Sequence, residues 1–215
     1  MREITAVALE ITTACNLHCP ECCCRIHERP AEHYPWIYFE SLVMGLRGIE
    51  RVDLTGGEPT AHPQFAEFVP KFKELYGCNR LTLESNGFKL KEYAHLLHHF
   101  DQIRLSKYPG ENEEICDWVL DRFPSYVQNG STCIEIGVEP DERRHIKRSR
   151  RGAGGPCLLG KFEFALVTGG LAYPCRLGPA VQGAVGMVLG QDWRRKVVEI
   201  PMPCKDCWFS PGDPE

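Results

Sequence analysis

The order of short apolar runs constrains the fold of this 215-residue chain more than any other feature. Strand-like runs alternate with longer helix-like stretches over the first two thirds of the sequence. Such repeated strand–helix units predict parallel strands joined by right-handed crossovers. The expected strands are residues 6–12, 51–55, 80–85, 102–106 and 132–138, and the expected helices are residues 37–46, 63–76, 89–100 and 113–121.

Side chains within the expected strands alternate between apolar and charged, so the two kinds fall on opposite faces. The apolar face contains Val7, Leu9, Ile11, Val52, Leu54, Leu81, Leu83, Ile103, Leu105, Ile134 and Ile136, and the other face Glu10, Asp53, Glu84, Arg104 and Glu135. A parallel sheet covered on both faces would be apolar on both. The pattern therefore predicts an α/β fold, a partial (β/α) barrel of five to six parallel strands with helices outside and a polar lumen. A half-exposed sheet is the alternative.

Composition points to a cytosolic protein. No apolar run reaches the roughly 18 residues that span a bilayer, and the start of the chain lacks the apolar region of a signal peptide. In that compartment, twelve cysteines indicate metal ligands rather than disulfides. The formal charge of −4 gives no reason to expect general nucleic-acid affinity or membrane association.

Three of the cysteines, Cys15, Cys19 and Cys22, follow the first expected strand on one short loop. Thiolates at this spacing can bind three irons of a [4Fe–4S] cluster and leave the fourth iron open to a small molecule. A zinc knuckle, or a chance spacing in a cysteine-rich chain, is the alternative. The second expected strand is followed by Gly56, Gly57, Glu58 and Pro59, in which the glycines allow close backbone approach and Pro59 stiffens the turn.

Together these two motifs resemble those of the radical S-adenosylmethionine (SAM) superfamily. The resemblance implies that SAM binds the open iron through its amino and carboxylate groups and is cleaved reductively to a 5′-deoxyadenosyl radical. It further implies that Gly56 to Pro59 cradle the methionine amino group at the carboxyl ends of the strands. Glu21 stands where the family usually has an aromatic residue before the third cysteine.

Two further strand ends match family positions that contact SAM. The run Ser85-Asn86-Gly87 resembles a turn beside the cofactor, although these residue types also suit a plain turn. Ser106 matches a serine that contacts the ribose, whereas Lys107 and Tyr108 depart from the family pattern. Arg104 and Glu135 lie on the polar faces of the fourth and fifth expected strands, where they either pair with each other or serve as catalytic residues that orient the substrate.

The remaining third of the chain contains a second cysteine set. A basic run at residues 141–151 is either a solvated surface or a lid, and it marks an expected boundary between domains at residues 1–150 and 151–215. Beyond it, Cys157 and Cys175 flank an expected β-hairpin around Gly169 and Gly170, and Cys204 and Cys207 follow. Four cysteines suit either a zinc ribbon or a second [4Fe–4S] cluster.

This arrangement resembles the twitch domain, a truncated SPASM domain that holds one auxiliary [4Fe–4S] cluster, and the overall plan is similar to that of the 2-deoxy-scyllo-inosamine dehydrogenases. The resemblance implies a radical SAM oxidoreductase that passes an electron from the substrate radical to the auxiliary cluster. The expected partners are a small-molecule or peptide substrate and an electron donor such as flavodoxin or ferredoxin. Peptide modification is the alternative reaction, although no leader-binding domain is expected before the first strand. A non-catalytic metal-binding or electron-transfer module is an alternative class, and action on tRNA or DNA is another that rests only on the basic run.

Overall fold

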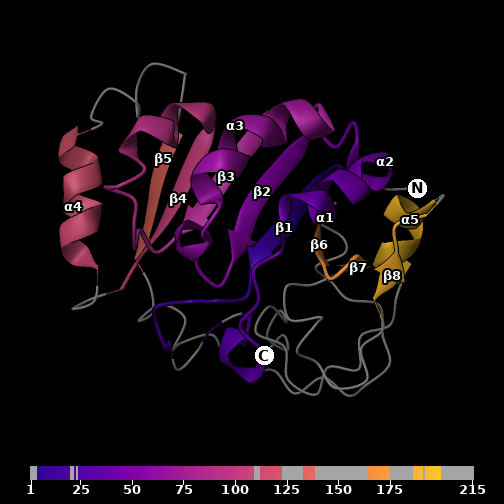
Figure 1. The fold of residues 1–215 in the computed structure, drawn as a ribbon, viewed down its shortest axis with the longest axis horizontal. Coiled ribbons are helices and arrows are strands. Elements are labelled where there is room, and N and C mark those ends of the chain that lie inside the picture. The colour runs from indigo at the N-terminus through magenta and orange to yellow at the C-terminus, as the bar shows by residue number, and fades with distance from the viewer. Residues whose placement is uncertain are drawn as a thin grey trace, which may run out of the picture.

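The computed structural model of the chain has a mixed α/β fold built on a largely parallel open sheet (Figure 1). It describes residues 4–19, 22, 24–108, 112–122, 133–138, 164–174, 186–190 and 192–199. The strands are β1 (Ala6–Thr12), β2 (Arg51–Gly56), β3 (Arg80–Ser85), β4 (Gln102–Lys107), β5 (Cys133–Val138), β6 (Phe164–Thr168), β7 (Leu171–Tyr173) and β8 (Met187–Val188). The five strands predicted from the sequence are therefore confirmed to within a residue.

The strands form one sheet in the order β5-β4-β3-β2-β1-β6-β7-β8. Every pairing from β5 through to β6 is parallel, and β7 and β8 are antiparallel to their neighbours. The predicted β-hairpin is confirmed as β6 and β7, whose turn places Gly169 and Gly170 at φ of 56° and 78°. Such positive angles at both turn positions favour glycine. Because β6 also pairs with β1, the hairpin continues the parallel sheet.

The helices are α1 (Trp36–Ser41), α2 (Val43–Leu46), α3 (Phe65–Tyr76), α4 (Glu113–Arg122) and α5 (Trp193–Lys196), with short 3-10 turns at Ile26–Glu28, Pro59–Ala61, Ala94–His99 and Val197–Glu199. The single helix expected at 37–46 is divided at Leu42. The α-helix expected at 89–100 is wrong, because this segment consists of turns and the 3-10 helix Ala94–His99. Leu90, Tyr93 and Leu96 recur every three residues, a spacing that suits a 3-10 turn.

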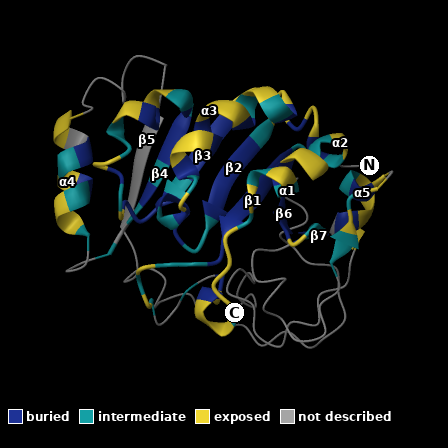
Figure 2. Ribbon diagram, in the orientation of Figure 1, coloured by how far each residue is buried: buried dark blue, intermediate teal, exposed yellow. Residues whose placement is uncertain are grey.

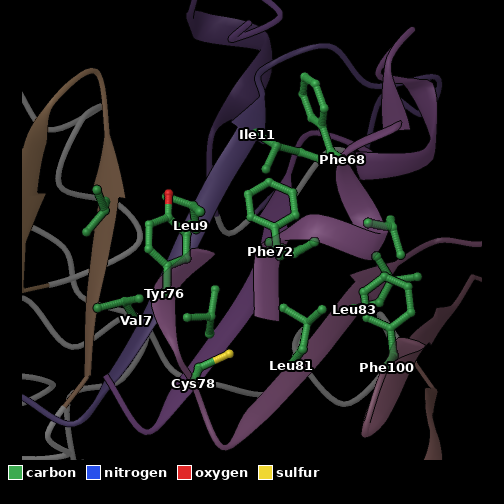
Figure 3. Close-up of a cluster of buried hydrophobic side chains, with 14 of the residues drawn as sticks. Val7, Leu9, Ile11, Phe68, Phe72, Tyr76, Cys78, Leu81, Leu83 and Phe100 are labelled. Atoms are coloured by element: carbon green, nitrogen blue, oxygen red, sulfur yellow. The ribbon is translucent and has the colours of Figure 1, made fainter. Parts of the chain in front are cut away.

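The two faces of the sheet differ in the way the sequence predicted. On one face, α3 lies across the strands, and Val7, Leu9 and Ile11 pack with its aromatic side chains (Figures 1 and 3). The aromatic rings of Phe39, Phe68 and Phe72 meet edge to face with centroids 5.2–6.1 Å apart, which adds specific geometry to apolar burial.

The opposite face contains the charged side chains, and its centre is buried (Figure 2). Glu10 is 1% exposed and Asp53 is fully buried, which fits the predicted lumen better than a half-exposed sheet. Buried charges require partners. Asp53 has Arg51 at 3.1 Å and Arg104 at 3.6 Å, and Arg104 also lies 3.4 Å from Glu84.

Candidate functional site

The cysteine loop leaves β1 at the carboxyl edge of the sheet and contains the three predicted cluster ligands. Cys15, Cys19 and Cys22 are free thiols of intermediate burial. The backbone N–H of Cys22 donates to the carbonyl of Cys19 at 3.2 Å, which turns the chain between these two residues. Pro20 and Glu21 lie outside the described residues.

Hydrogen bonds between residues 11–13 and 30–34 close the base of this loop. The Thr13 N–H donates to the carbonyl of Glu32 at 2.9 Å, and the Thr13 hydroxyl accepts from the Glu32 N–H at 2.7 Å. The N–H of Tyr34 donates to the carbonyl of Ile11 at 3.2 Å. These hydrogen bonds hold the two ends of the cysteine loop, residues 14–29, together beside the end of β1.

An ion pair between Glu10 and Arg29 lies at the base of this loop. Glu10 on β1 accepts two hydrogen bonds from the guanidinium of Arg29, at 2.6 and 2.8 Å, and one from the hydroxyl of Thr168 at 2.5 Å. The hydroxyl of Thr168 also lies 3.2 Å from that of Tyr34. Since Thr168 ends β6, this cluster joins the cysteine loop to the β6–β7 hairpin.

The Gly56–Gly57 pair brings the end of β2 against the start of the cysteine loop. The Gly57 N–H donates to the carbonyl of Thr12, and the Glu58 N–H donates to the carbonyl of Ala14, both at 2.8 Å. A Cβ at Gly56 would lie 2.1 Å from the Thr12 oxygen, and one at Gly57 would lie 2.2 Å from the Ala14 oxygen. No side chain fits there, so the glycines are required for the packing of this neighbouring backbone.

Glu58 turns its carboxylate into the protein, where it is fully buried. Its oxygens accept four hydrogen bonds, from the Thr60 N–H, the Thr60 hydroxyl, the Ser85 hydroxyl and the Asn86 N–H, at 2.6–3.0 Å. Burial raises the pKa of this carboxyl, and the hydrogen bonds oppose that rise. Three of these bonds end on Oε1 and one on Oε2, so the protein itself uses most of the acceptor capacity of this carboxylate. A ligand at this turn would meet the backbone of residues 56–59.

The ends of β3 and β4 are joined by a residue that sequence reasoning missed. The Asn112 side-chain amide donates to the carbonyls of Asn86 and Ser106, at 2.6 and 2.8 Å, and its oxygen accepts from the Tyr108 N–H at 2.7 Å. The available signal was its position before α4, since asparagine is favoured at helix starts. Through Asn112, the predicted SAM contacts Ser85, Asn86 and Ser106 are gathered at one edge of the sheet.

The donor chemistry at this edge fits an iron–sulfur cluster. Thiolates are soft ligands that select zinc or iron–sulfur clusters. Burial raises the pKa of the Cys15 thiol to about 11, and the hydrogen bond from the Leu17 backbone opposes that rise. In the part of the chain that the structure describes, no three His, Cys, Asp or Glu side chains are grouped as ligands of one metal ion. The ligands of a [4Fe–4S] cluster can lie further apart than those of a single metal ion, because each cysteine binds a different iron atom.

The predicted catalytic pair is only half described. Arg104 and Glu135 are register partners on β4 and β5, and the side chains of β5 lie outside the description. Among the described side chains, Arg104 has Asp53 and Glu84 as acidic neighbours, and it donates to the side chain of Gln102 at 3.1 Å. Both acidic residues had been placed on the polar face, but alternation alone does not predict which charges pair across strands.

Several predicted features lie outside the described residues. These are the auxiliary ligands Cys157, Cys175, Cys204 and Cys207, and the basic run at residues 141–151. Among the helices that are described, none is long and apolar enough to cross a membrane.

Comparison with known proteins gives a family match within the first half of the chain. Residues 9–106 match the family model of the Radical SAM superfamily. A probable GTP 3′,8-cyclase of Saccharolobus solfataricus is 28% identical over 156 residues, which cover 69% of this chain and 50% of that protein. The GTP 3′,8-cyclase of Geobacter sulfurreducens is 31% identical over 98 residues, or 43% of this chain and 30% of that one. The chain thus spans half or less of the length of these curated relatives.

Solved structures match over more of the chain. BtrN in complex with AdoMet and 2-DOIA superposes with a TM-score of 0.66 at 17% identity, covering 91% of this chain and 87% of BtrN. BtrN in an open conformation gives a TM-score of 0.58 at 15% identity, with 91% and 86% covered. At these identities the likeness is one of fold, and it agrees with the predicted partial barrel.

Proposed function

We propose that this chain, whose residues 9–106 match the family model of the Radical SAM superfamily, is a radical SAM enzyme acting on a small-molecule or peptide substrate. When bound, the cluster and SAM supply a reductive cleavage that yields a 5′-deoxyadenosyl radical able to remove a hydrogen atom from the substrate. The observation that carries the proposal is the convergence of three segments at one edge of the sheet. The Gly57 and Glu58 N–H groups bond the start of the cysteine loop, and the Asn86 side chain lies 3.9 Å from the Cys15 sulfur.

In this proposal the chain supplies the ligands of the cluster and the groups that bind and orient SAM. Cys15, Cys19 and Cys22 hold the cluster. The backbone of Gly56 to Pro59 receives the methionine amino group, while Ser85, Asn86 and Ser106 bind other parts of SAM. A one-electron donor such as flavodoxin or ferredoxin supplies the reductant.

The test is anaerobic reconstitution with iron and sulfide, followed by incubation with SAM and a strong reductant. Wild-type protein should form 5′-deoxyadenosine. Changing Cys15, Cys19 and Cys22 together to Ala should remove about four irons, one cubane, and abolish cleavage. Cys78, a buried cysteine elsewhere in the core, provides the matched control as Cys78→Ala, which should keep its iron. SAM cleavage by the triple variant would contradict the proposal.

We extend the proposal to the second cysteine set, Cys157, Cys175, Cys204 and Cys207. Here a substrate alcohol loses a hydrogen atom to the radical, then a proton and an electron, and becomes a ketone. The four cysteines hold the [4Fe–4S] cluster that accepts this electron. The proposal is supported by their spacing and by the β6–β7 hairpin, which lies between the first two cysteines as a twitch-like domain requires.

Changing Cys204 and Cys207 to Ala should remove about four irons, one cubane, while SAM is still cleaved without product. Retention of one zinc per chain, with iron content unaltered, would contradict the electron-acceptor role.

A second candidate is a reaction on a guanine nucleotide, favoured by the 27–31% identity to GTP 3′,8-cyclases. Incubation of the reconstituted enzyme with SAM, reductant and GTP discriminates between the two. Consumption of GTP in step with 5′-deoxyadenosine formation would favour the cyclase-like reaction. If the amount of GTP does not change, the dehydrogenase-like reaction is favoured.

A further inference from the structure

The side-chain amide of Asn86 has an orientation that its surroundings determine. Its oxygen Oδ1 accepts a hydrogen bond from the Phe88 N–H at 3.0 Å. A backbone N–H can only donate, so an oxygen must face it. The NH₂ group therefore points the other way, where it lies 3.0 Å from Oδ1 of Asn16 and 3.9 Å from the sulfur of Cys15.

The backbone of Asn86 is held equally firmly. Its N–H donates to the buried carboxylate of Glu58 at 2.7 Å, and its carbonyl accepts from the Asn112 side chain at 2.6 Å. The residue is 8% exposed. Since backbone and side chain are both anchored, the NH₂ group stays directed at the cysteine loop.

The Cys15 side chain is partly withdrawn from solvent. The Leu17 backbone also gives it a hydrogen bond. In such an environment each added donor has a larger electrostatic effect than it would have in water. Hydrogen bonds to the sulfurs are among the features that set the reduction potential of an iron–sulfur cluster.

We infer that Asn86 is a redox-tuning residue, whose amide donates an N–H···S hydrogen bond to Cys15 and thereby raises the reduction potential of the cluster. One-electron reduction adds negative charge that is shared with the ligand thiolates. An N–H donor stabilises this reduced form more than the oxidised form. The inference rests on the proposed function, and it assigns Asn86 a part in supplying the electron for SAM cleavage in addition to any contact with SAM.

Two substitutions remove the donor in different ways. Asn86→Asp keeps an oxygen for the Phe88 N–H but places oxygen instead of N–H toward the sulfur. Asn86→Leu keeps the approximate volume and removes both polar groups. Asn16→Ala is the matched control, because it removes a hydrogen bond from the same amide without removing the donor to sulfur.

The measurement is a potentiometric titration of the reconstituted protein, followed by the electron paramagnetic resonance signal of the reduced cluster. At a fixed potential, both Asn86 variants should show a ratio of reduced to oxidised cluster about threefold to tenfold below wild type. That is a fall of about 30–60 mV, at about 59 mV per tenfold for one electron. The Asp variant should fall further because its charge repels the added electron. The Asn16→Ala control should have the same reduction potential as wild type.

Three outcomes would overturn the inference: Asn86 variants with full iron that titrate with wild type, an equal fall in Asn16→Ala, or an Asp variant with a raised potential. If neither Asn86 variant binds iron, the wild-type protein provides the test. With ¹⁵N-labelled asparagine, electron–nuclear double resonance should detect ¹⁵N coupled to the reduced cluster, and the coupling should persist in labelled Asn16→Ala. Absence of that coupling would overturn the inference. Wild-type protein without a reducible cluster would instead contradict the proposed function.

Discussion

The two faces of the sheet are stabilised by different interactions. On the face toward α3, Leu54 and Leu83 are held by packing alone against rings such as Phe72, and many combinations of apolar residues of similar volume can satisfy such a face. On the lumen face, Glu10 and Asp53 are buried charges that depend on particular arginines. The outer face therefore stabilises the fold through apolar packing, whereas the inner face orders the elements around the cysteine loop through specific ion pairs.

The largest effect is expected on the outer face, for Phe72→Ala. Phe72 is fully buried, and its ring meets those of Trp36 and Phe39 with centroids 5.4 and 5.2 Å apart. Truncation of such a ring leaves a cavity and costs about 3–5 kcal/mol of unfolding free energy. Urea denaturation followed by circular dichroism measures the loss. Phe72→Leu should lose much less, and an equal loss in both variants would show that the face does not tolerate repacking.

Glu10→Ala on the lumen face should cost slightly less, about 3 kcal/mol, through a different mechanism. It leaves the guanidinium of Arg29, which is 14% exposed, without its carboxylate, and it also removes the acceptor for Thr168. The same urea titration measures the loss.

The paired variant Glu10→Met with Arg29→Met separates charge from packing, because replacing both members of a buried pair is often neutral. It should be more stable than Glu10→Ala. Equal destabilisation of the two would show that the lumen face, like the outer face, depends on volume and not on pairing.

The sequence predicts the outer face better than the inner one for a physical reason. Alternation along a strand determines which residues share a face, and the burial of Leu9, Leu54 and Leu83 follows from it. Pairing on the polar face depends on the lateral order of the strands. Arg104 has Glu135 as its register neighbour on β5, and its partners among the described side chains are Asp53 and Glu84.

The candidate site shows the same division. The positions of Cys15, Cys19, Cys22 and the two glycines follow from motif spacing, because local chain connectivity fixes them. The roles of Asn112 and Arg29 depend on contacts between segments that lie 19–26 residues apart, and no periodicity in the sequence encodes them. The segment at 89–100 shows a local failure, where apolar residues spaced by three or four allowed either kind of helix.

A smaller effect is expected for Arg104→Gln, about 1 kcal/mol of unfolding free energy. Arg104 is 33% exposed, so solvent screens its ion pairs, and Asp53 retains Arg51 at 3.1 Å. Iron content and SAM cleavage should be preserved, because Arg104 is not one of the proposed cluster ligands or SAM contacts. If this arginine orients the substrate, more 5′-deoxyadenosine will form per product than in wild type. Unchanged coupling would make Arg104 a structural residue, and Arg51→Gln is the control for the loss of one lumen charge.

The smallest effect concerns the reactivity of Cys15 and leaves the fold intact. Burial raises the pKa of this thiol from 9.0 to about 11, and only the thiolate reacts with iodoacetamide. In the folded, iron-free protein, alkylation of Cys15 should therefore rise about tenfold per pH unit up to about pH 11, and at pH 8 it should be about a hundredfold slower than in urea. Between about pH 9 and 11 the native state keeps a proton on Cys15 that the unfolded state has lost, so the contribution of this thiol to stability falls as pH rises and is constant below pH 9. Mass spectrometry of the Cys15 peptide measures both rates, and Phe72→Ala, which acts on the opposite face, should not change the pH profile. A profile in the folded protein that levels off near pH 9 would show that the edge of the lumen face is as open to solvent at Cys15 as an ordinary surface.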